Sequence, residues 1–233
     1  MTDVLKSEHH LLPRLVLGDW NGLVRDPIDL VRATFLIGAI VTSILGDTES
    51  AVRFFLTFVL LVGVRLLELP RPFDFGFTLG MMFQAWGNAL NLFTNDPWYD
   101  KVVHFVLPFF TAPLVYLLLA RLGVVPDLAQ KTERRHDLGI VIMSFSFGMT
   151  VGAFYEIYEW FADNALGADL HVGYGDTISD LADNAIGALG GSLLLLVWTT
   201  RGWGTTRRVP GGRLRGWQPT TPARRARGGA RAP

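Results

Sequence analysis

Two glutamates lie one helical turn apart in the stretch FYEIYEWFAD, residues 154–163, at the end of a long apolar segment. Glu156 and Glu159 fall near the C-terminus of the expected helix, where the helix dipole disfavours anions. As i and i+3 neighbours they also repel each other. A carboxylate in such surroundings must be protonated, paired with a cation or bound to a metal. The pair therefore marks a candidate site, unless both side chains simply reach water.

Two other segments carry residue types that bind cations or transfer protons. WYDKVVHF places Asp100 and His104 at i and i+4, at the start of an apolar stretch. GDTISDLADNAIGALGG brings several polar residues to one side of a later helix, namely Asp176, Asp180, Asp183 and Asn184. Because these segments and the glutamate pair all fall at the same expected end of the bundle, we expect their side chains to converge there.

Amides form a further polar face. Gln84, Asn88, Asn91 and Asn95 follow one another at spacings of 4, 3 and 4, which is one face of a helix. Such a face could make ordinary hydrogen bonds between helices. The functional alternative is that Asn88, Asn91 and Asn184 orient a substrate.

Oxygen-rich ligands with one imidazole suit Mg²⁺, Ca²⁺ or Mn²⁺, and Zn²⁺ less often. The residues that could hold such a divalent metal are Asp100, His104, Glu156, Glu159, Asp176, Asp180 and Asp183. Carboxylates held at different pKa values could instead perform acid–base chemistry. The candidate catalytic residues are Glu156, Glu159, Asp180 and His104.

Several of these residues also have a purely structural interpretation. Asp176 fits a helix N-cap, and the dipole favours a carboxylate in the first turn. A histidine near a membrane interface is often a structural hydrogen-bond donor. The Gly148–Gly152 and Gly187–Gly191 pairs have the small-xxx-small spacing of close helix packing.

The composition indicates what must position these residues. The chain is 50% hydrophobic and only 18% charged, below the roughly 25% typical of soluble domains, and its mean hydropathy is +0.31. A membrane protein with several spans fits these values. There is no cysteine, which excludes disulfides and thiolate metal sites. The N-terminus does not read as a cleavable signal peptide.

We predict an all-α fold, a polytopic bundle of six transmembrane spans joined by short connections. The spans are expected near residues 30–46, 51–69, 74–94, 102–120, 138–160 and 177–199. Residues 1–29 would form a cytoplasmic or interfacial segment, and residues 30–199 the transmembrane domain. Residues 200–233, rich in Arg, Gly and Pro, would be a disordered cytoplasmic tail.

The distribution of basic residues predicts the orientation. With a cytoplasmic N-terminus, all of the 21 Lys and Arg residues except Arg53 and Lys101 fall on the inner side. The positive-inside rule then places both termini in the cytoplasm, in a plasma (inner) membrane. The tail arginines could bind anionic lipid headgroups or act only as a topology anchor, and nucleic-acid binding is not expected.

The three polar motifs together resemble a known family. Asp-Lys-x-x-His-Phe, Tyr-Glu-x-x-Glu-Trp and Gly-Asp-Thr-x-x-Asp-Leu, in this order, resemble the YjdF-like predicted inner-membrane proteins and, more distantly, the VanZ-like membrane proteins. The VanZ-like pattern implies equivalent residues at Asp100, His104, Glu156, Asp180, Asn184 and Gly187. Glu159 with Trp160 follows the YjdF-like form, so the resemblance supports the site rather than a glycopeptide-resistance role.

Three functions are compatible with these patterns. A metal-binding site at the outer leaflet could act on a lipid or an envelope precursor. A proton- or ion-coupled transporter would use the carboxylates as a relay, but it needs polarity in the cytoplasmic half, which the sequence leaves mostly apolar. A non-catalytic scaffold or assembly protein would use the cluster only to hold helices together.

Overall fold

The computed structural model describes residues 27–128, 135–166 and 173–201, and every regular element in these ranges is a helix. The helices are α2 (Pro27–Ile44), α3 (Thr48–Leu66), α4 (Arg71–Ala89), α5 (Leu92–Asn95), α6 (Pro97–Arg121), α7 (His136–Leu166) and α8 (Tyr174–Thr200). The all-α prediction is confirmed. The predicted N-terminal segment and the Arg-rich tail lie almost entirely outside the described residues.

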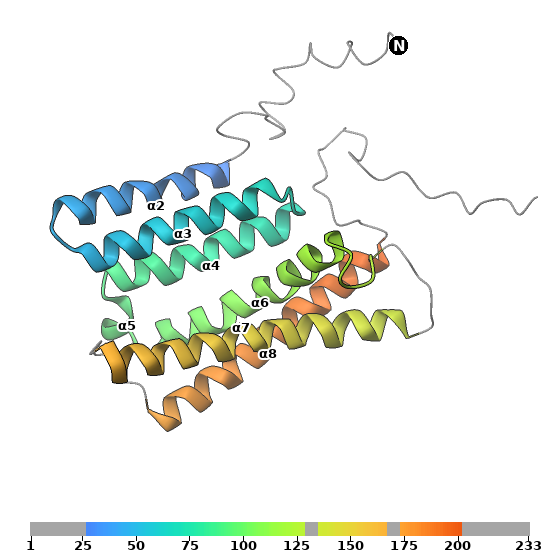
Figure 1. Cartoon of the computed structure of the whole chain (residues 1–233). Coiled ribbons are helices and arrows are strands. Elements are labelled where there is room, and N and C mark those ends of the chain that lie inside the picture. Colours follow the sequence, from blue (N-terminus) through green and yellow to red (C-terminus); the bar gives the residue numbers. More distant parts are fainter. Residues whose placement is uncertain (1–26, 129–134, 167–172, 202–233) are drawn as a thin grey trace, which may run out of the picture.

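The helices form two groups of three (Figure 1). α2, α3 and α4 pack against one another, and so do α6, α7 and α8. α4 and the one-turn helix α5 join the groups by packing against α6. Consecutive long helices run in opposite directions (Figure 1), as short connections between neighbours require.

Among the described residues, four helices are long and apolar enough to cross a membrane: α2, α6, α7 and α8. α3 and α4 have 19 residues each, but both carry more polarity. α3 contains three charged residues, Glu49, Arg53 and Arg65, and α4 combines Arg71 and Asp74 with amides near its end. Many large apolar side chains of the bundle face outward, as lipid contact requires.

The third predicted span ends earlier than expected. Its helix, α4, ends at Ala89 instead of near residue 94, because Asn91 takes a left-handed conformation (φ 55°) and α5 begins after it. The predicted four-amide face is therefore wrong as a continuous helix face. The α4–α5 turn points Asn91 to solvent.

Local sequence explains where α3 and α6 begin. Asp47 caps α3 by accepting a hydrogen bond from the Ser50 amide at 3.0 Å, and the pKa of its exposed carboxyl is lowered chiefly by the hydrogen bonds from Ser50. Asp96 caps α6 by accepting from the Trp98 amide at 3.0 Å. Pro97 follows at the first helical position, where its fixed φ suits a helix start. This start sets which turns of α6 carry Asp100 and His104.

α8 packs closely on α6 because small residues line the contact. A Cβ on Gly187 or Gly191 would overlap the backbone carbonyl of Phe105 or Phe109. α7 joins them at Gly148, where a Cβ would lie 2.7 Å from the Cβ atoms of both Ala112 and Ala188. The close-packing interpretation of the two glycine pairs is confirmed for these positions.

A buried ionic network ties α2, α3 and α4 together. Arg32, only 2% exposed, donates to Asp29 at 2.5 Å, to Asp74, and to the Thr78 hydroxyl at 3.1 Å. Arg65 of α3 donates to Asp29 at 3.1 Å. Arg32 and Arg65 thus neutralise buried carboxylates within the helices. The half that the sequence left mostly apolar contains a charged core.

Candidate functional site

His104 lies at the junction of α6, α7 and α8. It is the eighth residue of α6, so it sits about 10 Å along the axis from the helix start. Its side chain is 4% exposed. The T-shaped contact with the Tyr155 ring, at 5.8 Å between centroids, covers one side of the imidazole. The imidazole therefore lies about two helical turns from the start of α6, inside the bundle.

Both ring nitrogens of His104 face oxygen atoms. Nε2 lies 3.3 Å from Oδ1 of Asp100, one turn earlier on α6. Nδ1 lies 3.3 Å from Oδ1 of Asn184 on α8 and 3.4 Å from Oε1 of Glu156 on α7. The imidazole thus links all three helices through oxygen atoms.

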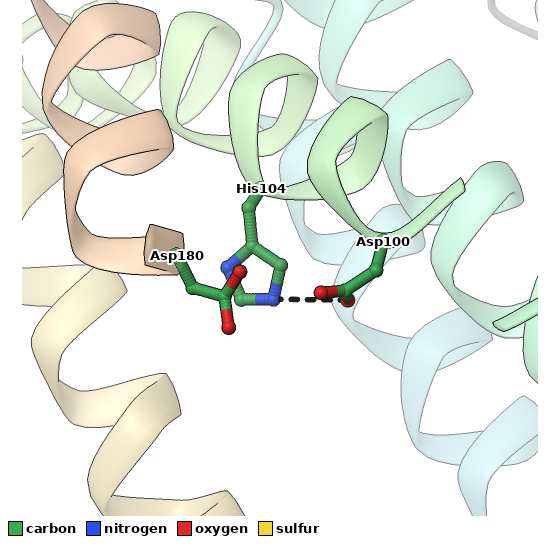
Figure 2. A group of neighbouring side chains, drawn as sticks. All are labelled: Asp100, His104 and Asp180. Atoms are coloured by element: carbon green, nitrogen blue, oxygen red, sulfur yellow. Dashed lines mark ion pairs between the residues drawn. The ribbon is translucent and has the colours of Figure 1, made fainter. Parts of the chain in front are cut away.

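Two groups of potential metal ligands share this histidine. Asp100, His104 and Asp180 form one, and His104, Glu156 and Glu159 form the other. Within each group, one ligand atom from every residue lies within 4.8 Å of the others. Figure 2 shows the first group, with the Asp180 carboxylate approaching the imidazole from α8 and Asp100 at its other side.

Burial makes this cluster costly without a partner. Glu156 is 5% exposed, and Asp180 and Asn184 are 2% exposed. Among the residues that the structure describes, Oε1 of Glu156 and Nδ2 of Asn184 have no hydrogen-bond partner. Four carboxylates, Asp100, Glu156, Glu159 and Asp180, surround one imidazole, so the group carries excess negative formal charge. A bound cation would both give the Glu156 oxygen a partner and offset this imbalance.

Two predicted metal ligands lie apart from these groups. Asp183 faces Lys101, with 3.6 Å between Oδ2 and Nζ, and Lys101 also donates to the Ser179 hydroxyl at 2.5 Å. Asp176 is exposed in the first turn of α8, where the helix dipole favours a carboxylate. The N-cap of α8 is Gly173, so the N-cap interpretation of Asp176 is wrong. Lys101 and Asp183 form a partly exposed rim above the buried cluster.

Of the three amides proposed to orient a substrate, only Asn184 reaches the cluster. Asn88 accepts a hydrogen bond from Arg53 of α3, and Asn91 lies in the α4–α5 turn. Gln84 connects α4 to the site, because its side-chain Nε2 donates a hydrogen bond to the Tyr155 hydroxyl. Sequence reasoning missed Tyr155 as a site residue; the only signal was its position directly before Glu156.

Comparison with known proteins gives a family for most of the chain. The family described as a predicted membrane protein (DUF2238) matches residues 29–201, which contain the long helices, apart from the first two residues of α2, and the whole cluster. None of the curated proteins and none of the solved structures matches the chain. The membrane-protein part of the predicted resemblance is confirmed, and the likeness to YjdF-like and VanZ-like proteins stays a prediction.

Proposed function

The chain belongs to the DUF2238 family of predicted membrane proteins, and we propose that it binds one divalent cation between α6, α7 and α8 and uses it on a lipid or an envelope precursor. His104, Glu156, Glu159, Asp180 and Asp100 are the ligands or acid–base groups. We also propose that the chain crosses the plasma membrane six times, with both termini in the cytoplasm and the site facing outward.

One observation carries the proposal. Oε1 of Glu156 is buried, accepts no hydrogen bond among the described residues, and lies 3.4 Å from Nδ1 of His104. One carboxylate oxygen of Glu156 lies within 4.8 Å of a ligand atom of His104 and of Glu159. A buried carboxylate oxygen left in this way is expensive. An imidazole with carboxylate oxygens this close is a ligand set that Mn²⁺, Mg²⁺ and Zn²⁺ accept.

The place of the cluster suggests the kind of substrate. α6 and α8 both begin at the end of the bundle that holds the cluster (Figure 1), so in a bilayer the cluster would lie just below the headgroups. Lys101, at the partly exposed rim, would attract an anionic group such as a phosphate. A cation beneath it could polarise a phosphoryl oxygen or lower the pKa of a bound water.

Mn²⁺ binding tests the proposal directly. The full chain is purified in detergent, treated with EDTA, and titrated with Mn²⁺ while the signal of free Mn²⁺ is followed by electron paramagnetic resonance. We expect one bound ion per chain. Glu156→Gln and Asp180→Asn should weaken binding by at least about tenfold, since each removes a ligand.

Asp176→Asn is the matched control, because it makes the same chemical change on α8 outside both ligand groups. It should leave Mn²⁺ affinity within about twofold of the unaltered protein, as expected for an exposed and screened charge. A wild-type chain that binds no Mn²⁺ would contradict the proposal. Lipid mass spectrometry of reconstituted vesicles, with Glu156→Gln as the inactive reference, would then identify a product formed only with metal.

Ion-coupled transport is the second candidate, because the structure contains buried charge at both ends of the bundle. Arg32, Asp29 and Asp74 lie near the starts of α2 and α4, opposite the His104 cluster (Figure 1). A relay needs such polarity on both sides. Vesicles loaded with a pH-sensitive dye would show proton flux that Glu156→Gln abolishes. An unchanged dye signal under an imposed gradient would exclude proton coupling.

A further inference from the structure

In both groups of three helices, polar residues lie in corresponding parts of the first, second and third helix. In α2–α4, the polar residues lie near the start of the first helix, near the end of the second and near the start of the third. In α6–α8, the cluster again uses the start of the first helix, the C-terminal half of the second and the start of the third. The order of contributing segments is the same in both groups.

The contacts correspond as well. Arg32 on the first helix of its group pairs with an acid one turn earlier, Asp29, and reaches Thr78 on the third helix at 3.1 Å. His104 likewise faces an acid one turn earlier, Asp100, at 3.3 Å, and Asn184 on the third helix at 3.3 Å.

The third helices repeat one further element. Asp74 precedes Thr78 by four residues, and Asp180 precedes Asn184 by four residues. Each aspartate therefore lies on the same helix face as the polar residue that contacts Arg32 or His104. Asp74 is 1% exposed and Asp180 2% exposed, so both carboxylates are buried beside the central residue of their cluster.

The two groups have opposite orientations. α2 and α4 begin at one end of the bundle, whereas α6 and α8 begin at the other, beside α5 (Figure 1). A unit with an odd number of spans ends on the opposite side of the membrane from where it begins, so a second copy that follows it is inverted. Inverted repeats of this kind are common among membrane proteins.

The charges of the two clusters differ. Arg32 and Arg65 balance Asp29 and Asp74 in the first group. The second helix of the first group contributes Arg65 near its end, whereas the second helix of the other group contributes Glu156 and Glu159 in its C-terminal half. The first cluster is neutral through its own side chains, and the second lacks a comparable cation among its described buried residues.

We infer that α2–α4 and α6–α8 are two inverted copies of one three-helix unit, and that the Arg32 guanidinium occupies the place that a bound divalent cation takes next to His104 in the second copy. This rests on the proposed function for the cation itself. The cation would then lie against the acids of α6 and α8, Asp100 and Asp180, as Arg32 lies against Asp29 and Asp74. Only the end of the bundle that holds His104 would carry an ion site.

Installing a fixed cation at His104 tests this inference. We expect His104→Arg to bind Mn²⁺ at least about thirtyfold more weakly, because the guanidinium takes the ion's place. Without metal, its melting temperature should exceed that of His104→Met, in which the carboxylates keep no cation. His104→Lys introduces a narrower cationic side chain and serves as the second variant if arginine does not fit. All are made in the full chain and compared after EDTA treatment.

The results separate the inference from the proposed function. If the wild type binds Mn²⁺ but His104→Arg and His104→Lys melt no higher than His104→Met, or fail to fold while His104→Met folds, the correspondence with Arg32 is wrong and the metal site stands. If the wild type binds no Mn²⁺, the proposed function fails. The melting temperatures of the metal-free His104 variants then still show whether position 104 accepts a cationic side chain, as position 32 does.

Discussion

At the scale of single residues, the molecule holds two kinds of buried charge. Arg32 is enclosed by carboxylates that it neutralises. Glu156 has one oxygen that accepts no hydrogen bond within the described part of the chain. In the first arrangement two guanidinium groups face two carboxylates, whereas in the second four carboxylates share one imidazole. A buried charge must be compensated, and for this reason we propose a bound cation only for the second.

Replacing Arg32 should therefore be one of the most destabilising changes in the protein. Arg32→Met removes the buried guanidinium that binds both Asp29 and Asp74, and we expect a loss of about 3–5 kcal/mol in the free energy of unfolding. Glu49→Gln removes one partner of an exposed pair with Arg53, in which the glutamate side chain is 80% exposed, and should cost at most about 1 kcal/mol. Thermal unfolding in detergent measures both. Equal losses for the two variants would contradict this view of the network.

At the scale of helices, the site depends on how closely α8 approaches α6. Gly187 and Gly191 meet the backbone carbonyls of Phe105 and Phe109, and this contact brings Asn184 to His104. A backbone carbonyl cannot move away by changing rotamer as a side chain can. The close spacing of α6 and α8 therefore requires residues without a Cβ at these two positions.

Gly191→Ala should force α6 and α8 apart. We expect a loss of about 1–3 kcal/mol in stability, as for other overpacked contacts, together with weaker Mn²⁺ binding. Gly63→Ala on α3 is the control, because a Cβ there meets nothing within 4 Å and alanine favours a helix by about 1 kcal/mol. Melting temperatures of the two variants should move in opposite directions. A Gly191→Ala protein as stable as the wild type would show that the helices can adjust.

The N-cap of α3 predicts a pH dependence. Because hydrogen bonds from Ser50 lower the pKa of Asp47 in the folded chain, its ionised carboxylate stabilises the fold above the unfolded pKa of about 3.9. That contribution is lost as the pH falls through the lower folded pKa. Asp47→Asn keeps a capping side chain that does not titrate. The melting temperature of the wild type should fall relative to Asp47→Asn only in acid; a constant difference across pH would contradict the prediction.

At the scale of the whole molecule, the number of spans decides which connections reach each side of the membrane. Four helices in the described part of the chain meet the length and hydropathy of a span, and α3 and α4 add two more polar crossings in the six-span topology. The α3–α4 connection at Glu68 distinguishes the two arrangements, because it is cytoplasmic with six spans and external if α3 and α4 do not cross.

The absence of cysteine makes this topology easy to test with single introduced thiols. Glu68→Cys should react with a membrane-impermeant maleimide only after the cells are permeabilised. With a cytoplasmic N-terminus, Thr48→Cys should react in intact cells and Val124→Cys only after permeabilisation in both topologies, so these two variants serve as controls. Reaction of Glu68→Cys in intact cells would support four spans.

The sequence alone determined the class of the fold and singled out the titratable residues of the cluster, together with Asp176 and Asp183, which lie outside it. Apolar segments of span length can bury their backbone polar groups in a membrane only as helices, so the all-α bundle follows from composition and segment length. Charged residues inside such segments stand out because lipid gives them no partner. For that reason His104, Glu156 and Asp180 could be selected without coordinates.

Only the tertiary structure decided which polar residues meet. Helical spacing places Asp183 on the same helix side as Asp180, yet Asp183 lies against Lys101 and Asp180 lies in the metal-type group with His104. The pairing of Arg32 with Asp74, 42 residues apart, carries no local signal at all. Periodicity fixes the face of each helix, but contacts between faces depend on helix rotation and separation, and these are set by packing across the bundle.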